Sequence, residues 1–128
     1  MLELTSGVNW IAVIVGAVVA FLIGWLWYSP KLFGTKWAEG VGLDLTTITG
    51  VQAPAMITQV VGIFLLSWVV GITAAANSLL LCILIIVTIA VLIIANGYFA
   101  QKSAYARNTE AGYIIVMGIV MIAAQGIF

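Results

Sequence analysis

Four long runs of apolar residues, separated by shorter polar stretches, dominate the pattern of this chain. Each run is about as long as the ~20 residues that a helix needs to cross the hydrocarbon core of a bilayer. We predict no strands. The pattern therefore favours an all-α fold, an integral membrane four-helix bundle that forms a single transmembrane domain over residues 1–128. The predicted spans are residues 8–29, 55–76, 79–99 and 109–128.

Pro30 marks the end of the first span. It has no backbone N–H to donate, and its ring pushes Ser29 away from the helical conformation. Beyond it, apolar residues recur at every fourth position, at Phe33, Trp37 and Val41. With Ser29 as N-cap and Pro30 at the first helical position, this spacing predicts a short amphipathic helix over residues 30–40, lying in the headgroup region.

Aromatic residues gather at both ends of the first span, as they do at the two membrane–water interfaces of spanning helices. Asn9 and Trp10 stand at one end. At the other end we expect an interfacial anchor made of Trp25, Trp27, Tyr28, Pro30, Phe33 and Trp37. The first helix is therefore expected to leave the membrane near Tyr28.

Charge is scarce and unevenly placed. Only 6% of the residues are charged and 65% are hydrophobic, whereas a soluble domain carries roughly 25% charged residues, so lipid is the expected solvent. The net charge of zero argues against a nucleic-acid partner. The basic residues follow the first and third spans, at Lys31, Lys36, Lys102 and Arg107. The positive-inside rule then places both of these loops in the cytoplasm and both termini outside.

The second of these basic stretches, residues 101–110, is predicted to be a polar loop. Near its end, Asn108 is a suitable N-cap for a fourth span that begins at Thr109.

Small residues recur at helical spacing in two spans. The first span carries them at every fourth position, at Ala12, Gly16, Ala20 and Gly24, and the second has a shorter series at Ser67, Gly71 and Ala75. Small side chains let two helix backbones approach closely, which stabilises helix association in lipid. The face on the first span is therefore predicted to pack against another helix, either within the same chain or in a second copy of it.

Uncharged polar residues within the spans form a second set, made of Asn9, Gln59, Thr88, Asn96 and Gln125. A polar group in hydrocarbon is costly unless it is hydrogen-bonded, so these side chains are expected to find partners between helices. Gln59 and Asn96 are both expected toward the cytoplasmic side, where they could meet. The alternative is that the set lines a small pore or pocket.

Several kinds of chemistry lack the residues that they need. The chain has no histidine and one cysteine, Cys82, so we expect no metal site and no disulfide. The middle of each predicted span is free of charged residues, which argues against a proton-coupled or ion-coupled pump. No nucleophile has a recognisable base nearby. We expect neither catalysis nor a cofactor.

Two groups of motifs resemble one known family. The first is Asn9-Trp10, Gly24, Trp27-Tyr28-Ser29-Pro30, Phe33-Gly34 and Trp37; the second is Asn96-Gly97-Tyr98-Phe99, Ala111-Gly112-Tyr113 and Gly118. Together they resemble the domain of unknown function 1761 family, whose members are small bacterial and archaeal membrane proteins of about four spans. The resemblance implies a prokaryotic inner membrane and supplies no chemistry. Members often carry an acidic residue where this chain has Ala100, so no role of that acid is carried over.

These observations leave three functional hypotheses. The first is a non-catalytic protein that self-associates or serves as an accessory subunit of a larger membrane complex, as the small-residue face suggests. The second is an oligomeric channel or carrier for a small neutral solute, with a path lined by Gln59, Thr88 and Asn96. The third is a lipid- or pigment-binding subunit, whose binding surface consists of Trp25, Trp27, Tyr28 and Trp37.

Overall fold

The structure is a computed structural model that describes residues 2–42 and 53–128. Every regular element in these ranges is a helix, which confirms the predicted all-α fold. Each of the long helices is long and apolar enough to cross a membrane: α2 (Trp10–Trp27), α4 (Ala53–Ala75), α5 (Leu79–Phe99) and α6 (Ala104–Ile127). Two short helices accompany them, α1 (Leu2–Thr5) and α3 (Gly34–Val41).

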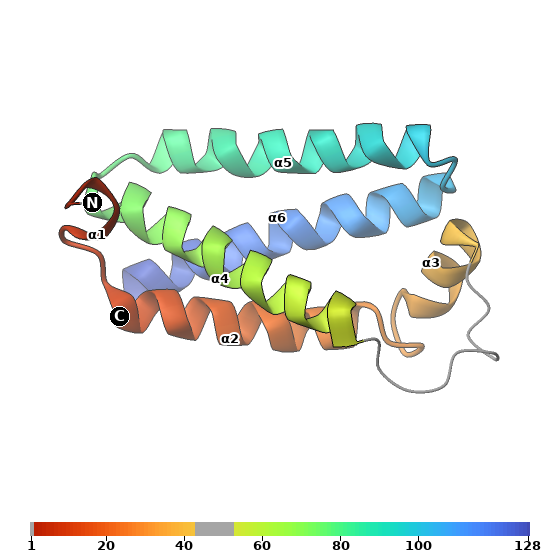
Figure 1. The fold of residues 1–128 in the computed structure, drawn as a ribbon, viewed down its shortest axis with the longest axis horizontal. Coiled ribbons are helices and arrows are strands. Elements are labelled where there is room, and N and C mark those ends of the chain that lie inside the picture. The colour runs from red at the N-terminus through yellow and green to blue at the C-terminus, as the bar shows by residue number, and fades with distance from the viewer. Residues whose placement is uncertain (1, 43–52) are drawn as a thin grey trace.

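The long helices run side by side, and α6 is the helix that joins the others together (Figure 1). It packs against α2, α4 and α5, and its first turns carry α3. Both chain termini and α1 lie at one end of the bundle, called here the terminal end. The opposite end, called here the α3 end, holds α3, the last turn of α2, the start of α4 and the turn between α5 and α6.

The core lies between α2, α4, α5 and α6, and its centre is lined by apolar residues from all four. Met121 and Val13 are among its largest fully buried side chains. The outward faces are apolar as well, as on α5, where Leu80 is 81% exposed and Leu92 is 63% exposed. A surface of this kind is suited to hydrocarbon rather than to water, because monomeric soluble proteins rarely expose large contiguous apolar patches.

The segment after α2 differs from its prediction, because α3 begins at Gly34 rather than at Pro30. The predicted Ser29 cap is therefore wrong. The Ser29 hydroxyl donates instead to the carbonyl of Leu26, at 2.7 Å, and Phe33 is the residue that precedes α3, without a capping side chain. Residues 28–33 form turns around the end of α2 instead of a first helical turn.

The tight fold of these turns explains the Phe-Gly motif. The backbone N–H groups of Leu32 and Gly34 both donate to the Ser29 carbonyl, at 3.1 and 2.9 Å. Gly34 consequently lies so close to the backbone of Tyr28 that a Cβ at position 34 would collide with its carbonyl. A glycine is the residue that fits this close approach.

The fourth long helix also starts earlier than predicted. Ser103, in an extended conformation, is its N-cap, and its Oγ accepts a hydrogen bond from the backbone N–H of Ala106 at 3.0 Å. The predicted cap Asn108 lies within α6, so that prediction is wrong. The polar composition of residues 101–110 indicated a loop, whereas Arg107 and Glu110 belong to the first two turns of the helix. The other long helices begin or end within two residues of their predicted bounds.

Candidate functional site

The small-residue face of α2 points into the bundle. Ala12, Gly16, Ala20 and Gly24 are all buried. A Cβ added at Gly16 would lie 3.1 Å from the hydroxyl oxygen of Ser67 on α4 and 3.4 Å from Met121 on α6. This face is therefore occupied by other helices of the same chain, which leaves no room on it for a second copy.

The shorter small-residue series on α4 packs against the same part of α2. The buried hydroxyl of Ser67 donates to the Val13 carbonyl of α2 at 2.7 Å. Gly71 is buried, and a Cβ there would lie 3.3 Å from the side-chain nitrogen of Gln125. Ala75, the last residue of α4, is exposed.

The uncharged polar residues do not come together. Asn9 caps α2, where its Oδ1 accepts from the backbone N–H of Ala12 at 3.1 Å. Thr88 is exposed and donates to Leu84 of its own helix at 2.7 Å. Asn96 is exposed near the end of α5, and its predicted partner Gln59 instead interacts with the hydroxyl of Tyr113. Among the described residues, these side chains line no common path.

Gln125 lies at the terminal end, beside a smaller cavity of about 310 Å³. Thr73, Asn77, Ser78 and Cys82 are among the residues that line this cavity with it. The side-chain nitrogen of Gln125 is buried and has no hydrogen-bond partner in the part of the chain that the structure describes. The same part holds no cluster of three or more histidine, cysteine or acidic residues that could bind a metal.

A larger cavity of about 660 Å³ opens at the α3 end, between α2, α3, α4 and α6. We call it the aromatic cavity. Its aromatic lining consists of Phe21, Trp25, Tyr28, Trp37 and Tyr113, and its polar lining includes Gln59 and Glu110. Three of the four residues proposed as a binding surface, Trp25, Tyr28 and Trp37, lie here.

Tyr113 forms the floor of this cavity and is held from two sides. Its hydroxyl donates to the Ala20 carbonyl of α2 at 2.6 Å, and the Gln59 amide approaches the same hydroxyl from α4. Gly24 leaves the space that the Tyr113 ring needs, since a Cβ there would collide with the hydroxyl. The position of Tyr113 in the cavity therefore requires Gly24, which is also a residue of the small-residue face.

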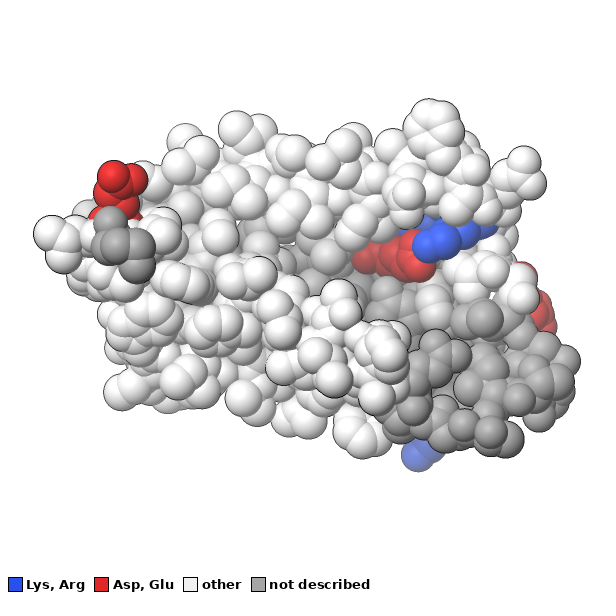
Figure 2. Space-filling view, viewed as in Figure 1, with Lys and Arg blue, Asp and Glu red and all other residues white. Residues whose placement is uncertain are grey.

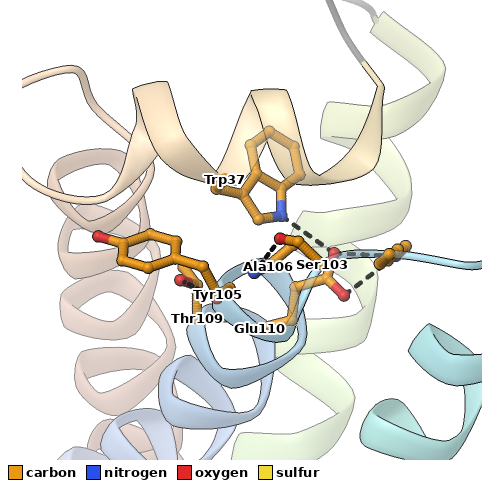
Figure 3. A network of polar contacts seen from close by, with 7 residues as sticks. Trp37, Ser103, Tyr105, Ala106, Thr109 and Glu110 are labelled. Atoms are coloured by element: carbon orange, nitrogen blue, oxygen red, sulfur yellow. Dashed lines mark hydrogen bonds and ion pairs between the residues drawn. The ribbon is translucent and has the colours of Figure 1, made fainter.

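Glu110 forms the polar wall, and Figure 3 shows Trp37 reaching toward it from α3. The Trp37 indole N–H donates to its Oε2 at 3.1 Å. The Lys102 ammonium contacts both carboxylate oxygens at 3.0 Å, and both side chains of this ion pair are largely buried. Lys102 is itself held in place, because the Arg107 guanidinium donates to its carbonyl at 2.7 Å.

Tyr28, the residue directly after α2, stands between these groups. Its ring packs edge-on against Trp37, with centroids 4.9 Å apart, and against Tyr113 at 5.6 Å. Burial raises the pKa of its hydroxyl, and the Glu110 carboxylate and Tyr113 raise this pKa further. The hydroxyl therefore stays protonated.

The other predicted anchor residues divide into two groups. Trp27 points into the bundle, where its indole N–H donates to the Thr109 carbonyl at 2.9 Å and its ring packs against Phe33 at 4.7 Å. Trp25 and Pro30 face outward, and Trp25 is 71% exposed. Much of the aromatic cluster thus joins α2 and α3 to α6 within the chain.

A protein-family comparison matches residues 11–125 to a family described as "protein of unknown function" DUF1761. The chain belongs to the DUF1761 family. The match covers both groups of motifs from which the resemblance was drawn, apart from Asn9-Trp10, and that resemblance is confirmed. Searches among curated proteins and among solved structures found no match to this chain.

In this DUF1761 protein, the glycines of the second motif group mark close helix contacts. A Cβ at Gly97 would collide with the side chain of Arg107, and one at Gly118 would collide with Ile86. Gly112 faces Trp27, at 3.3 Å from the position that a Cβ would take. These glycines therefore allow α2 and α5 to pack close to α6.

The residues whose polar groups build the wall and floor of the site, Lys102, Glu110 and Tyr113, were not singled out in the sequence. Tyr113 stood in a motif, but nothing local to the motif indicated that its hydroxyl reaches α2. Glu110 was placed in a predicted loop, where a carboxylate is normally solvated. The earlier start of α6 is what turns it toward the cavity, and the Ser103 cap was the available signal.

Proposed function

We propose that this DUF1761 protein is a non-catalytic multi-pass membrane protein that binds an amphipathic molecule from the bilayer in its aromatic cavity. The observation that carries the proposal is a cavity of about 660 Å³ with a largely apolar lining, rich in aromatic residues, and a few polar groups. Ligand pockets commonly measure roughly 300–1,000 Å³ and have this composition. The lipid- or pigment-binding hypothesis is the one that these features favour.

The mixture of apolar and polar groups in the lining supports an amphipathic ligand in particular. Phe21 and Met56 offer apolar surface for a hydrocarbon body. Gln59 and Glu110 offer polar contacts for a head group. Trp25, which lines the cavity and is 71% exposed, places an opening of the cavity at the outer surface of the bundle. A ligand dissolved in the bilayer can reach the site there.

The two other hypotheses have less support. Self-association, or docking as an accessory subunit, was suggested by the small-residue face, and Gly16 and Gly24 on that face are buried within the chain. Either role would have to use the outward faces of the helices. A channel for a neutral solute needs Gln59, Thr88 and Asn96 on one path, and Thr88 and Asn96 are exposed on α5.

The orientation proposed for the protein places the α3 end in the cytoplasm and both termini outside, in a prokaryotic inner membrane. Figure 2 shows the basic side chains of the visible face at the α3 end. Residues Lys31, Lys36, Lys102 and Arg107 all belong to that end, as the positive-inside rule requires. A reporter fused after Phe128 should be active only outside the cytoplasm. Activity restricted to the cytoplasm would reverse the orientation.

Photolabelling tests the binding function directly. The probe is a neutral monoacylglycerol with a diazirine in its acyl chain, added to the purified protein in a neutral detergent. We expect saturable labelling that maps to cavity residues such as Trp25 and Met56. Labelling that never saturates, or that falls equally on the exposed leucines of α5, would contradict the proposal.

A matched pair of variants on α4 provides the control. Ala55 lines the cavity, so Ala55→Phe should narrow it and weaken labelling about tenfold, a loss of roughly 1.4 kcal/mol of binding free energy. Ile57 is 64% exposed and lies outside the lining, so Ile57→Phe should leave labelling unchanged. Equal effects of the two changes would mean that the probe binds elsewhere.

A further inference from the structure

We propose that the aromatic cavity prefers amphiphiles with a positively charged head, such as an alkylammonium ion. This inference rests on the proposed binding function and specifies the chemical class of its ligand. It depends on which groups of the polar wall face the cavity and which lie behind it.

The first argument is the charge of the lining. Among the described residues that line the cavity, Glu110 is the one that carries a formal charge. Its partner Lys102 is not part of this lining and reaches the carboxylate from the turn that precedes α6. A head group in the cavity therefore meets the carboxylate before it meets the ammonium.

The second argument is the remaining capacity of that carboxylate. Glu110 accepts three hydrogen bonds, two from the Lys102 ammonium and one from the Trp37 indole. A carboxylate offers about four lone-pair sites, so one direction is left for a further donor. A protonated amine can use this direction without displacing either existing partner.

The third argument is the set of aromatic rings beside the carboxylate. The Tyr28 ring lies 4.9 Å from that of Trp37 and 5.6 Å from that of Tyr113, centroid to centroid. Aromatic faces carry a negative electrostatic potential that attracts ammonium groups, and this attraction strengthens where water is excluded. Three such rings in a lining that also includes the Glu110 carboxylate form a suitable environment for a cation and a poor one for an anion.

Tyr28 reports the influence of the same carboxylate. Burial is the main cause that raises the pKa of the Tyr28 hydroxyl, and the Glu110 carboxylate raises this pKa further, although Glu110 is paired with Lys102. Lys102 then acts as an internal competitor, because its ammonium neutralises part of the charge that a ligand could use.

Competition against the neutral photoprobe tests the preference in the full-length protein. Protonated dodecylamine, dodecylglycerol and dodecyl sulfate share one chain length and differ in head charge. The ammonium compound should displace the probe at a concentration about tenfold lower than the neutral one, and the sulfate should be the weakest. Equal displacement by the cationic and neutral compounds, or strongest displacement by the sulfate, would overturn the proposal.

Two variants of the ion pair make the test specific. Glu110→Gln keeps an acceptor for Trp37 and removes the charge, so the advantage of the ammonium compound should fall to less than about threefold while the neutral compound still competes. Lys102→Gln removes the competitor and should increase this advantage by about threefold or more. If Lys102→Gln instead weakens binding of the ammonium compound, Lys102 does not compete with the ligand for Glu110 and the proposal fails.

Glu39→Gln is the matched control, because Glu39 is an exposed carboxylate on α3 outside the cavity lining. It should leave the order of the three compounds unchanged. If it removes the preference as Glu110→Gln does, the cation is attracted by the general charge of the surface and the proposal is wrong. Absence of saturable photolabelling would refute the binding function itself, whereas labelling without a charge preference would refute only this inference.

Discussion

Polar side chains line a cavity at each end of α6, and the two ends differ in whether these side chains are hydrogen-bonded. At the α3 end, Glu110 and Tyr113 line a cavity of about 660 Å³, and both have hydrogen-bond partners on other elements. At the terminal end, Gln125 lines a cavity of about 310 Å³, and its buried nitrogen has no partner among the described residues. The larger cavity is therefore the one whose polar side chains are held in place by hydrogen bonds to other elements.

The difference shows how each end is held together. Directional bonds cross between helices at the α3 end, from Trp27, Trp37 and Tyr113 to residues more than 70 positions away in sequence. In the terminal half of α2, the hydrogen bond from Ser67 to Val13 is accompanied by close approach, at Gly16 against Ser67 and at Val13 against Gly71. Hydrogen bonds specify the position of a side chain more narrowly than van der Waals contact does, which suits a binding site.

The largest expected effect is at Gly24, where the two modes of packing meet. Gly24→Ala should destabilise the protein by about 1–3 kcal/mol, because the added methyl group displaces Tyr113 from a filled space. The matched change Gly62→Ala adds its methyl group where no atom lies within 4 Å and should be neutral or slightly stabilising. Thermal unfolding in detergent measures both, and equal shifts would contradict the packing argument.

A smaller loss is expected from removing one hydrogen bond of the α3 end. Tyr113→Phe deletes the hydroxyl that donates to Ala20 and should cost about 1 kcal/mol. Tyr105→Phe is the same chemical change on a ring that is 38% exposed, and we expect it to alter stability by less than about 0.5 kcal/mol. Unfolding midpoints measured side by side would show whether the buried bond contributes more than the exposed hydroxyl.

The smallest expected effects on stability come from replacing a glutamine, and they should have opposite signs at the two ends of the bundle. Gln125→Met removes a buried donor that lacks a partner, so it should stabilise the protein by roughly 0.5–1 kcal/mol. Gln59→Met removes an amide that interacts with Tyr113 and should destabilise it by a few tenths of a kcal/mol, about the size of a modest interhelical bond. Destabilisation in both variants would indicate that Gln125 has a partner after all.

The family and the helical architecture were accessible from the sequence. The motifs around Trp27 and Asn96 identified the DUF1761 family, and the apolar runs predicted the long helices. The starts of α3 and α6 were not predicted correctly, because Ser29 and Asn108 are plausible caps, whereas α3 begins after Phe33 and α6 begins after Ser103. Local propensity does not decide which of several polar residues caps a helix.

Only part of the candidate site could be predicted from the sequence. Tyr28 and Trp37 were recognised as a possible binding surface, yet the expected direction was outward to the membrane surface. In the structure they face Tyr113 and Glu110 on α6. An aromatic residue at the end of a span satisfies the interface equally well in either direction, so composition alone does not reveal which side it takes.

The sequence by itself determines the features that depend on length, polarity and spacing along one helix. Hydrocarbon admits few polar groups, so the apolar runs had to be helices, and a repeat of four had to bring small residues such as Gly16 and Gly24 onto one face. Which helix fills that face depends on how distant segments pair. The meeting of Trp37 with Glu110, 73 residues apart, exists only once α3 has turned back onto α6, and tertiary packing alone creates it.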